Sequence, residues 1–197
     1  MKDVTAVILA AGMGTRMKSS LPKVLHRAAG RPLVEYPVRA ALELGVASVV
    51  VVTSGHPEIA RSLDAAFGAR VTTVVQDPPR GTGDAARVGL ARVETERALI
   101  YYGDAPLMTA RELEAIVAAS REAELAFASA LPENPHGYGR VLRDESGRVL
   151  EVREQRDLRS DAERGVREVN AGVYAAKKSV LARAIAELKP MNAQGEL

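Results

Sequence analysis

Apolar runs of strand length alternate with stretches of helical periodicity through the first part of the chain. The predicted strands are residues 4–9 and 48–53, whose apolar runs indicate burial, and residues 71–75 and 98–102. The predicted helices are residues 31–44, 57–67, 84–93 and 109–122, the last with Thr109 as its N-cap. Because strands and helices alternate, we expect a mostly parallel sheet with helices on both faces.

The pattern changes after residue 125. Shorter strands are predicted at residues 125–130, 138–141, 149–154 and 169–175, with a charged segment at 156–167 and a last helix at 178–188. These strands are expected to form a smaller mixed or antiparallel extension. The fold class predicted is therefore α/β, a Rossmann-like mostly parallel sheet with this extension, in one domain spanning residues 1–197.

Composition narrows the class of protein. With 47% hydrophobic and 26% charged residues the chain has an ordinary globular composition, and no apolar run approaches the roughly 20 residues of a membrane span. A net charge of +2, with both signs interspersed, gives no reason to expect nucleic acid. The chain has no cysteine and starts without the apolar stretch of a signal peptide, so the cytoplasm is the predicted location.

A glycine-containing loop follows the first strand, in the stretch Leu9-Ala10-Ala11-Gly12-Met13-Gly14-Thr15-Arg16-Met17, and leads to Leu21-Pro22-Lys23. Glycines let backbone N–H groups approach an anion, and an arginine and a lysine add positive charge, so the loop suits nucleotide phosphates. Two common phosphate-binding motifs are excluded. A Walker loop needs lysine and a hydroxyl residue where the chain has Thr15-Arg16, and a dinucleotide fingerprint needs a third glycine where the chain has Met17.

Two further segments follow predicted strand ends and are expected to converge with this loop, since ligands bind at the carboxyl ends of parallel strands. Asp104 offers carboxylate oxygens that could hold Mg²⁺ on nucleotide phosphates, although an aspartate after Gly103 also shapes turns. Gln76 carries an amide with both donor and acceptor, which could recognise the edge of a base. A surface loop is the alternative for residues 76–83.

The Gly12 loop together with Leu21-Pro22-Lys23 closely resembles the signature of sugar-phosphate nucleotidyltransferases. Further motifs extend the resemblance over essentially the whole chain, and as a set they look like the bacterial N-acetylglucosamine-1-phosphate uridyltransferase domain. These motifs are Gln76 with Gly81-Thr82-Gly83-Asp84-Ala85, Tyr101-Tyr102-Gly103-Asp104, Gly137-Tyr138-Gly139-Arg140, Glu154, Glu168-Val169-Asn170-Ala171-Gly172 and Asn192-Ala193-Gln194-Gly195-Glu196.

The resemblance implies a nucleotide-diphospho-sugar transferase fold and a role for each matching residue. It implies a nucleotide-binding half at residues 1–110 and a sugar-binding half at 111–197. Arg16 and Lys23 are implied as catalytic and Asp104 as the metal ligand. The residues implied in nucleotide binding are Leu9, Ala10, Ala11, Gly12, Gly14, Thr15, Gln76, Gly81 and Thr82, and those in sugar binding are Tyr102, Gly139, Glu154 and Asn170. From the sequence alone, Glu154 could equally be a solvated surface residue, Tyr102 a core residue and Glu168 a salt-bridge partner.

The implied reaction is uridylyl transfer from UTP to N-acetylglucosamine 1-phosphate with Mg²⁺. The sugar phosphate is already ionised at pH 7 and can attack the α-phosphorus in line without a general base. His26, His56 and His136 are far apart in the sequence, so none is predicted to act as a nucleophile or zinc ligand.

Some features depart from this family's pattern. Pro79 stands where the family usually has a second glutamine that helps to bind the base, which leaves another base or sugar phosphate open. Family members continue beyond the Asn192 motif into further sugar and metal residues, so the sugar-binding half is expected to be incomplete and a UTP-binding module without turnover is an alternative. We find no hexapeptide repeats of a β-helix acetyltransferase domain, and hence predict no acetyl transfer. A homo-oligomer is left open, and a trimer is implied only together with such a domain.

Overall fold

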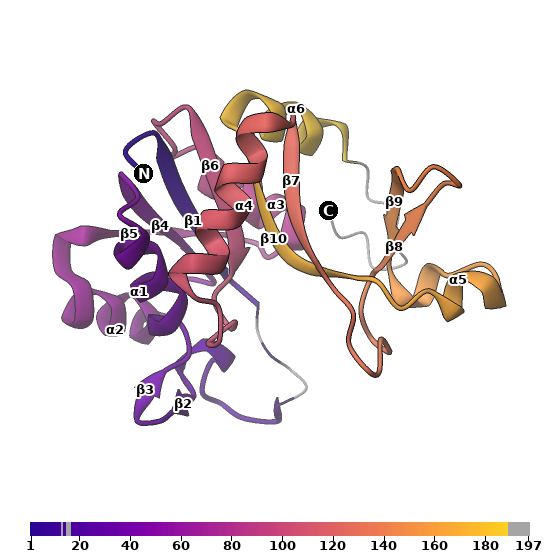
Figure 1. The fold of residues 1–197 in the computed structure, drawn as a ribbon. Coiled ribbons are helices and arrows are strands. Elements are labelled where there is room, and N and C mark those ends of the chain that lie inside the picture. The colour runs from indigo at the N-terminus through magenta and orange to yellow at the C-terminus, as the bar shows by residue number, and fades with distance from the viewer. Residues whose placement is uncertain (13, 15–16, 189–197) are drawn as a thin grey trace. The chain divides into compact units, whose positions relative to one another are not determined.

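The computed structural model describes residues 1–12, 14 and 17–188, and the chain divides into two compact units (Figure 1). The larger unit comprises Met1–Ala126 together with the segment from Tyr174 onward, and the smaller unit comprises Phe127–Val173. Of the helices in the described part of the chain, none has the length and apolar character that crossing a membrane requires.

A parallel sheet forms the centre of the larger unit. Its strands lie in the order β5 (Val71–Val75), β4 (Ser48–Thr53), β1 (Val4–Ala10) and β6 (Arg97–Tyr102), all parallel. The last residues of β10 (Val169–Lys177) pair with β6 in the antiparallel direction. Because strands β1 and β4 are apolar on both faces, the sheet needs a layer of helices on each side.

Helices provide both layers. Helix α3 (Thr82–Leu90) packs with α6 (Lys178–Glu187) against one face, in a cluster that includes Val7, Val52 and Ile100. On the other face lie α1 (Glu35–Leu44), α2 (Pro57–Phe67) and α4 (Ala110–Glu122), and α4 is drawn in front of the strands in Figure 1.

Side chains of β6 anchor the helices of this second face. The Tyr101 hydroxyl donates a hydrogen bond to the backbone oxygen of Pro37 in α1 at 2.7 Å, and burial raises the pKa of Tyr101 above its ordinary value. Arg97, also buried, donates to the backbone oxygen of Ser120 in α4 at 2.7 Å. These two hydrogen bonds tie β6 to α1 and α4, although Nε of the buried Arg97 has no partner among the described residues.

The strand order reverses beside β1. The chain passes from β1 to β4 and then β5 on one side, and returns through α3 to β6 on the other side of β1. In sheets of this kind, loops at the carboxyl ends of the two strands flanking the reversal leave a crevice in which ligands bind. The fold therefore places the candidate site after β1 and β6.

The smaller unit is built on antiparallel pairing. Strands β8 (Arg140–Arg143) and β9 (Val149–Arg153) form a hairpin, Val169 at the start of β10 pairs with Arg140, and β7 (Leu125–Ala130) pairs with β10. Its buried apolar side chains include Val141, Leu158, Val169 and Val173. The remaining short elements are β2 (Arg27–Ala28), β3 (Arg31–Pro32), α5 (Asp161–Gly165) and the 3-10 turns η2 (Lys23–Leu25), η3 (Gly68–Arg70) and η4 (Gln155–Asp157).

The predicted fold class is confirmed, with differences at element ends. The helix predicted at 31–44 is wrong at its start, because residues 31–32 pair with residues 27–28 across a turn in which Ala29 and Gly30 both have positive φ. The helix predicted at 84–93 is α3, which begins earlier, at Thr82. The strand predicted at 138–141 begins at Arg140, and β10 runs on to Lys177. The division into functional halves at residue 110 stays a prediction.

Candidate active site

The loops after β1 and β6 touch at the point where the strand order reverses. The backbone N–H of Gly103 donates to the Leu9 oxygen at 2.8 Å. A Cβ atom at Gly103 would lie 3.0 Å from Cβ of Ala10, closer than side chains normally approach, so glycine suits this position. Tyr102 is the half-buried last residue of β6, and Asp104 follows two residues later. This contact brings Asp104 beside the loop that follows β1.

Lys23 and Asp104 form an ion pair between Nζ and Oδ2. Lys23 begins η2, directly after Pro22, and the loop glycine Gly14 packs so tightly on it that a Cβ there would lie 2.6 Å from Cβ of Lys23. Both charged side chains are accessible, at 42% for Lys23 and 28% for Asp104, so the pair adds little to stability. The pair matters because it shows that the predicted catalytic lysine and the predicted metal ligand are in direct contact.

The other predicted residues of the first loop line the same end of β1. Leu9 is half-buried and Ala10 and Ala11 are buried, whereas Gly12 is exposed and a Cβ there would meet no atom within 4 Å. The predictions for Thr15 and Arg16 lie outside the residues that the structure describes. The described part of the loop therefore offers backbone near the Lys23 and Asp104 pair.

Gln76 lies directly after β5 and is only 2% exposed. Its backbone N–H donates to the Thr53 oxygen at 2.9 Å, continuing the contact between β4 and β5. Its side-chain Nε2 donates to the Gly81 oxygen at 3.0 Å and to Oδ2 of Asp84 at 2.9 Å. Gly81 has a φ of 99°, which favours glycine, and the exposed Thr82 opens α3. Gln76, Gly81 and Thr82 are thus brought together.

Asp84 belongs to the Gly81-Thr82-Gly83-Asp84-Ala85 motif, but the sequence predicts no role for it. Its carboxylate is buried and accepts hydrogen bonds from Nε2 of Gln76 and from Nε and Nη2 of Arg87, the latter two at 3.1 and 2.6 Å. Burial alone would raise the pKa of Asp84, but the hydrogen bonds from Gln76 and Arg87 outweigh it and hold the pKa below its ordinary value. Asp84 is therefore an ionised acceptor for both neighbours.

The predicted sugar residues Gly139, Glu154 and Asn170 come together in the smaller unit. The backbone N–H of Asn170 donates to the Gly139 oxygen at 2.9 Å, and Oε1 of Glu154 lies 3.1 Å from the position of a Cβ at Gly139. Glu154 is exposed, Asn170 is half-buried and Gly139 is buried. The Glu154 carboxylate is thus accessible for hydrogen bonds to a neutral ligand.

Two residues that the sequence gave no role support this cluster. Arg140, only 2% exposed, donates to the Tyr138 oxygen and, through Nη2, to Oε1 of Gln155 at 2.8 Å. The same Gln155 oxygen accepts the backbone N–H of Gly137 at 3.1 Å. The loop on either side of Gly139 is thereby fixed. The sequence shows Arg140 as part of the Gly137-Tyr138-Gly139-Arg140 motif but gives no sign of this supporting role.

Glu168 is a salt-bridge partner, one of the two roles considered from the sequence. Its carboxylate accepts two hydrogen bonds of 2.7 Å from Nε and Nη2 of Arg143. The Arg143 guanidinium lowers the pKa of Glu168 from its ordinary value to about 2. This bidentate pair ties β8 to the residue that precedes β10.

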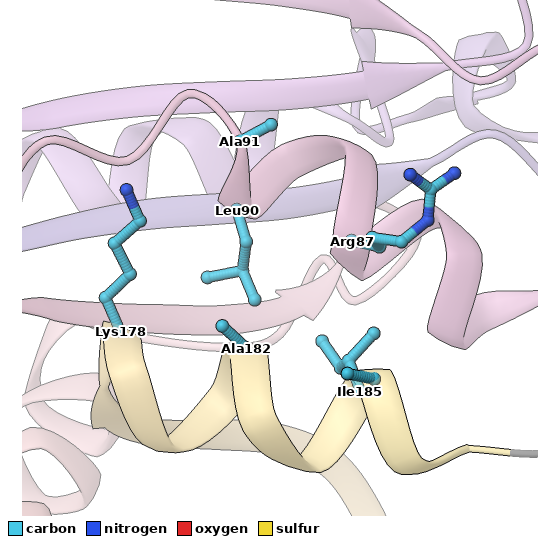
Figure 2. Close-up of a pocket in the computed structure, with 7 residues that line it drawn as sticks. Arg87, Leu90, Ala91, Lys178, Ala182 and Ile185 are labelled. Carbon is cyan, nitrogen blue, oxygen red and sulfur yellow. The ribbon is translucent and has the colours of Figure 1, made fainter.

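Within residues 1–12, 14 and 17–188, no three histidine, aspartate, glutamate or cysteine side chains gather as a ready metal cage. A hollow of about 260 Å³ lies instead between α3 and α6, and Figure 2 shows Leu90 facing Ala182 across it, with Lys178 and Arg87 toward its two ends. None of the residues predicted for the site lines this hollow in the described part of the chain.

The strand order, with its reversal beside β1, is that of the nucleotide-diphospho-sugar transferase fold. Residues 6–169 match the MobA-like NTP transferase domain family, and the chain belongs to that family.

Among curated proteins, the chain is 47% identical over 203 residues to the bifunctional protein GlmU of Sorangium cellulosum, a match that covers 98% of this chain and 43% of that protein. It is 45% identical over 202 residues to GlmU of Anaeromyxobacter dehalogenans, covering 98% of this chain and 41% of the relative. The chain thus spans less than half the length of the curated relatives it matches.

Solved structures agree on the fold. HddC from Yersinia pseudotuberculosis aligns with a TM-score of 0.73 and 21% identity, covering 98% of this chain and 81% of HddC. A Bacillus anthracis protein assigned as a glucose-1-phosphate thymidylyltransferase, crystallised with sucrose, aligns with a TM-score of 0.76 and 20% identity, covering 98% of this chain and 78% of that one.

Proposed function

We propose that the chain transfers uridylyl from UTP to N-acetylglucosamine 1-phosphate, giving UDP-N-acetylglucosamine and pyrophosphate. The observation that carries the proposal is the meeting of Lys23 and Asp104 at the reversal point of the strand order, in a chain 47% identical to a GlmU over nearly its whole length. The matching motifs favour the N-acetylglucosamine-1-phosphate uridyltransferases over thymidylyl- and cytidylyltransferases.

The larger unit would hold the nucleotide. Backbone groups at residues 9–12 and at Gly14, which packs on Lys23, would surround a triphosphate, whose charge the lysine would partly neutralise. Gln76, Gly81 and Thr82 would contact the base. Arg16 would bind the pyrophosphate that leaves.

An oxygen of the sugar phosphate would attack the α-phosphorus of UTP opposite the bond to the β-phosphate. The bond from that oxygen to phosphorus forms while the bond to pyrophosphate breaks, and the electron pair leaves with pyrophosphate. No proton has to be removed, because the attacking phosphate is ionised near pH 7. Catalysis would consist of holding two anions in line and neutralising their charge, with Lys23 placed at the α-phosphate.

Asp104 is the described residue that would hold Mg²⁺. It offers carboxylate oxygens, the donors that Mg²⁺ prefers, and a cation fits beside it because the Lys23 ammonium already lies there. A single carboxylate suits Mg²⁺ that also binds substrate phosphates. When bound, Mg²⁺ would supply positive charge that stabilises the transferring phosphoryl group.

In the smaller unit, the sugar would be recognised by Gly139, Glu154 and Asn170. The exposed carboxylate of Glu154 can accept hydrogen bonds from sugar hydroxyls. A sugar that leaves such a partner unpaired would lose about 1–3 kcal/mol of binding. The absence of cysteine supports the cytoplasm as the place of the reaction.

The test is pyrophosphate release by the chain with UTP, Mg²⁺ and N-acetylglucosamine 1-phosphate. We expect turnover that needs all three components and falls at least about 100-fold in Asp104→Asn, since one charged ligand of the transferring group is lost. Asp64→Asn on the exposed side of α2 is the matched control and should keep full activity.

Replacing UTP with CTP, or the sugar phosphate with glucose 1-phosphate, tests the substrates. Faster turnover with either replacement would overturn the assignment of base or sugar. UTP binding without any turnover would reduce the chain to a nucleotide-binding module.

A further inference from the structure

The side-chain amide of Gln76 is held in one orientation by two acceptors. Nε2 lies 2.9 Å from Oδ2 of Asp84 and 3.0 Å from the backbone oxygen of Gly81. A carboxylate and a peptide carbonyl can only accept hydrogen bonds, so the atom that faces them has to be the nitrogen. Turning the amide over would place three oxygens together in a buried position, where unpaired polar atoms are costly.

Arg87 holds Asp84 in place. The guanidinium donates to Oδ1 through both Nε and Nη2, while Oδ2 remains for Gln76. Arg87 stands one helical turn after Asp84 on α3, the spacing at which side chains of a helix meet. Each carboxylate oxygen therefore has its own donor, and Gln76 faces a fixed acceptor.

The locked amide has only its carbonyl oxygen left for a ligand, because both N–H bonds are used. An acceptor suits the N3–H group of uracil or thymine, whereas N3 of cytosine carries a lone pair and would repel it. We propose that Asp84 is a positioning residue that makes Gln76 an obligate acceptor and thereby selects a base with an N3–H group. This inference rests on the proposed function, which places the base at Gln76.

The fixed orientation of the Gln76 amide, called the lock below, would also explain how the base is selected although Pro79 stands where the family usually has a second glutamine. One side chain of fixed orientation can discriminate between bases, whereas one that is free to turn over would accept either. The same argument predicts no discrimination between uracil and thymine, which share the N3–H group.

The experiment compares the dissociation constants of UTP, CTP and 5-methyl-UTP, measured by calorimetry, for the wild-type chain and Asp84→Asn. Arg87 only donates, so the new amide should keep its oxygen toward Arg87 and turn its N–H toward Gln76, which removes the lock. We expect the preference for UTP over CTP to fall about tenfold, the effect of one hydrogen bond, while 5-methyl-UTP continues to bind like UTP.

The controls separate this inference from the proposed function. A wild-type chain that does not prefer UTP over CTP would contradict the proposed base. A wild-type preference that Asp84→Asn retains would overturn the role of Asp84 alone, as would an equal loss of affinity for all three nucleotides. Asp64→Asn should leave every ratio unchanged.

A measurement on the wild-type chain covers the case in which Asp84→Asn does not fold. Glutamine occurs in the sequence only as Gln76, Gln155 and Gln194, so the side-chain amide signals are few enough to assign by NMR. Both Nε2 protons of Gln76 should exchange with solvent at least about 100-fold more slowly than those of a free glutamine. If these protons exchange as fast as those of free glutamine, the Gln76 amide is not held in one orientation and the inference is wrong.

Discussion

Because Gly89 has no Cβ atom, helix α3 can lie directly on the sheet. A Cβ atom there would be 2.3 Å from Cγ1 of Val7 and 2.9 Å from Cγ2 of Val52, both on strands in the middle of the sheet. Valine is stiff at χ1, so neither side chain can easily turn away. The approach of α3, and with it the position of Asp84 at its first turn, depends on this residue.

We therefore predict that Gly89→Ala destabilises the chain. Alanine favours a helix over glycine by about 0.5–1 kcal/mol, but the clash in a packed core costs more, and the net loss should be roughly 1–2 kcal/mol. Urea unfolding followed by circular dichroism measures it.

Gly12→Ala is the matched control, because a Cβ there meets no atom within 4 Å. It should keep the wild-type unfolding free energy while weakening UTP binding, as its proposed place beside the phosphates requires. Equal stability of the wild type and Gly89→Ala would contradict the packing argument.

At the scale of elements, the Arg143 and Glu168 pair holds the β8–β9 hairpin to the start of β10. The pKa of Glu168 is lowered in the folded chain from 4.5 to about 2 by the hydrogen bonds from Arg143. A lowered pKa means that the pair stabilises the fold fully above pH 4.5, and that this contribution is lost as the pH falls from 4.5 toward 2.

Arg143→Met should accordingly reduce the unfolding free energy at pH 7, and the difference from the wild type should shrink as the pH falls below 4.5. Chemical unfolding at a series of pH values measures this. Arg148→Met, an exposed position on the same hairpin, is the control and should be neutral throughout. A difference that stays constant with pH would show that packing of the arginine, and not its charge, matters.

Elements were predictable from the sequence where local signals agreed. The valine run at Ser48–Thr53 and the helix Pro57–Phe67, which is followed by a glycine, have the bounds predicted for them. The β2–β3 pair was missed because two-residue strands are too short to show an alternating pattern. Helix α3 begins earlier than predicted because the positive φ of Gly81 already turns the chain into the helix.

The candidate site was predictable where residues follow strand ends, as Asp104 and Gln76 do. The partnership of Lys23 with Asp104 depends on how two loops approach, which one sequence does not contain. Asp84 escaped notice because an aspartate in the first turn of a helix is common and usually serves the helix itself. The roles of all these residues toward a substrate remain predictions.

At the scale of the whole molecule, the two units differ in the size of their buried cores. The larger unit buries long apolar strands between two layers of helices, whereas the smaller unit buries a few side chains such as Val141 and Val173 around a hairpin. The prediction of one domain spanning residues 1–197 stays a prediction. Each compact unit has its own buried side chains, and we expect the smaller core to be the weaker.

Hydrogen exchange followed by mass spectrometry tests this difference. We expect the backbone amides of β8 and β9 to exchange at least about tenfold faster than those of β1 and β4, because a small core opens with less free energy. Equal protection in both units would mean that the chain opens only as a whole.

The pairing of Lys23 with Asp104 also bears on the order in which the chain can take up its ligands. A divalent ion that binds alone would have to compete with the Lys23 ammonium group for the Asp104 carboxylate. A triphosphate would give that ammonium group another anion to pair with. If the proposed function holds, metal and nucleotide would therefore bind best together, and Lys23 would exchange the Asp104 carboxylate for a phosphate oxygen. Because Lys23 belongs to the same chain as Asp104, its ammonium group is always beside that carboxylate and would compete there with free metal at any metal concentration.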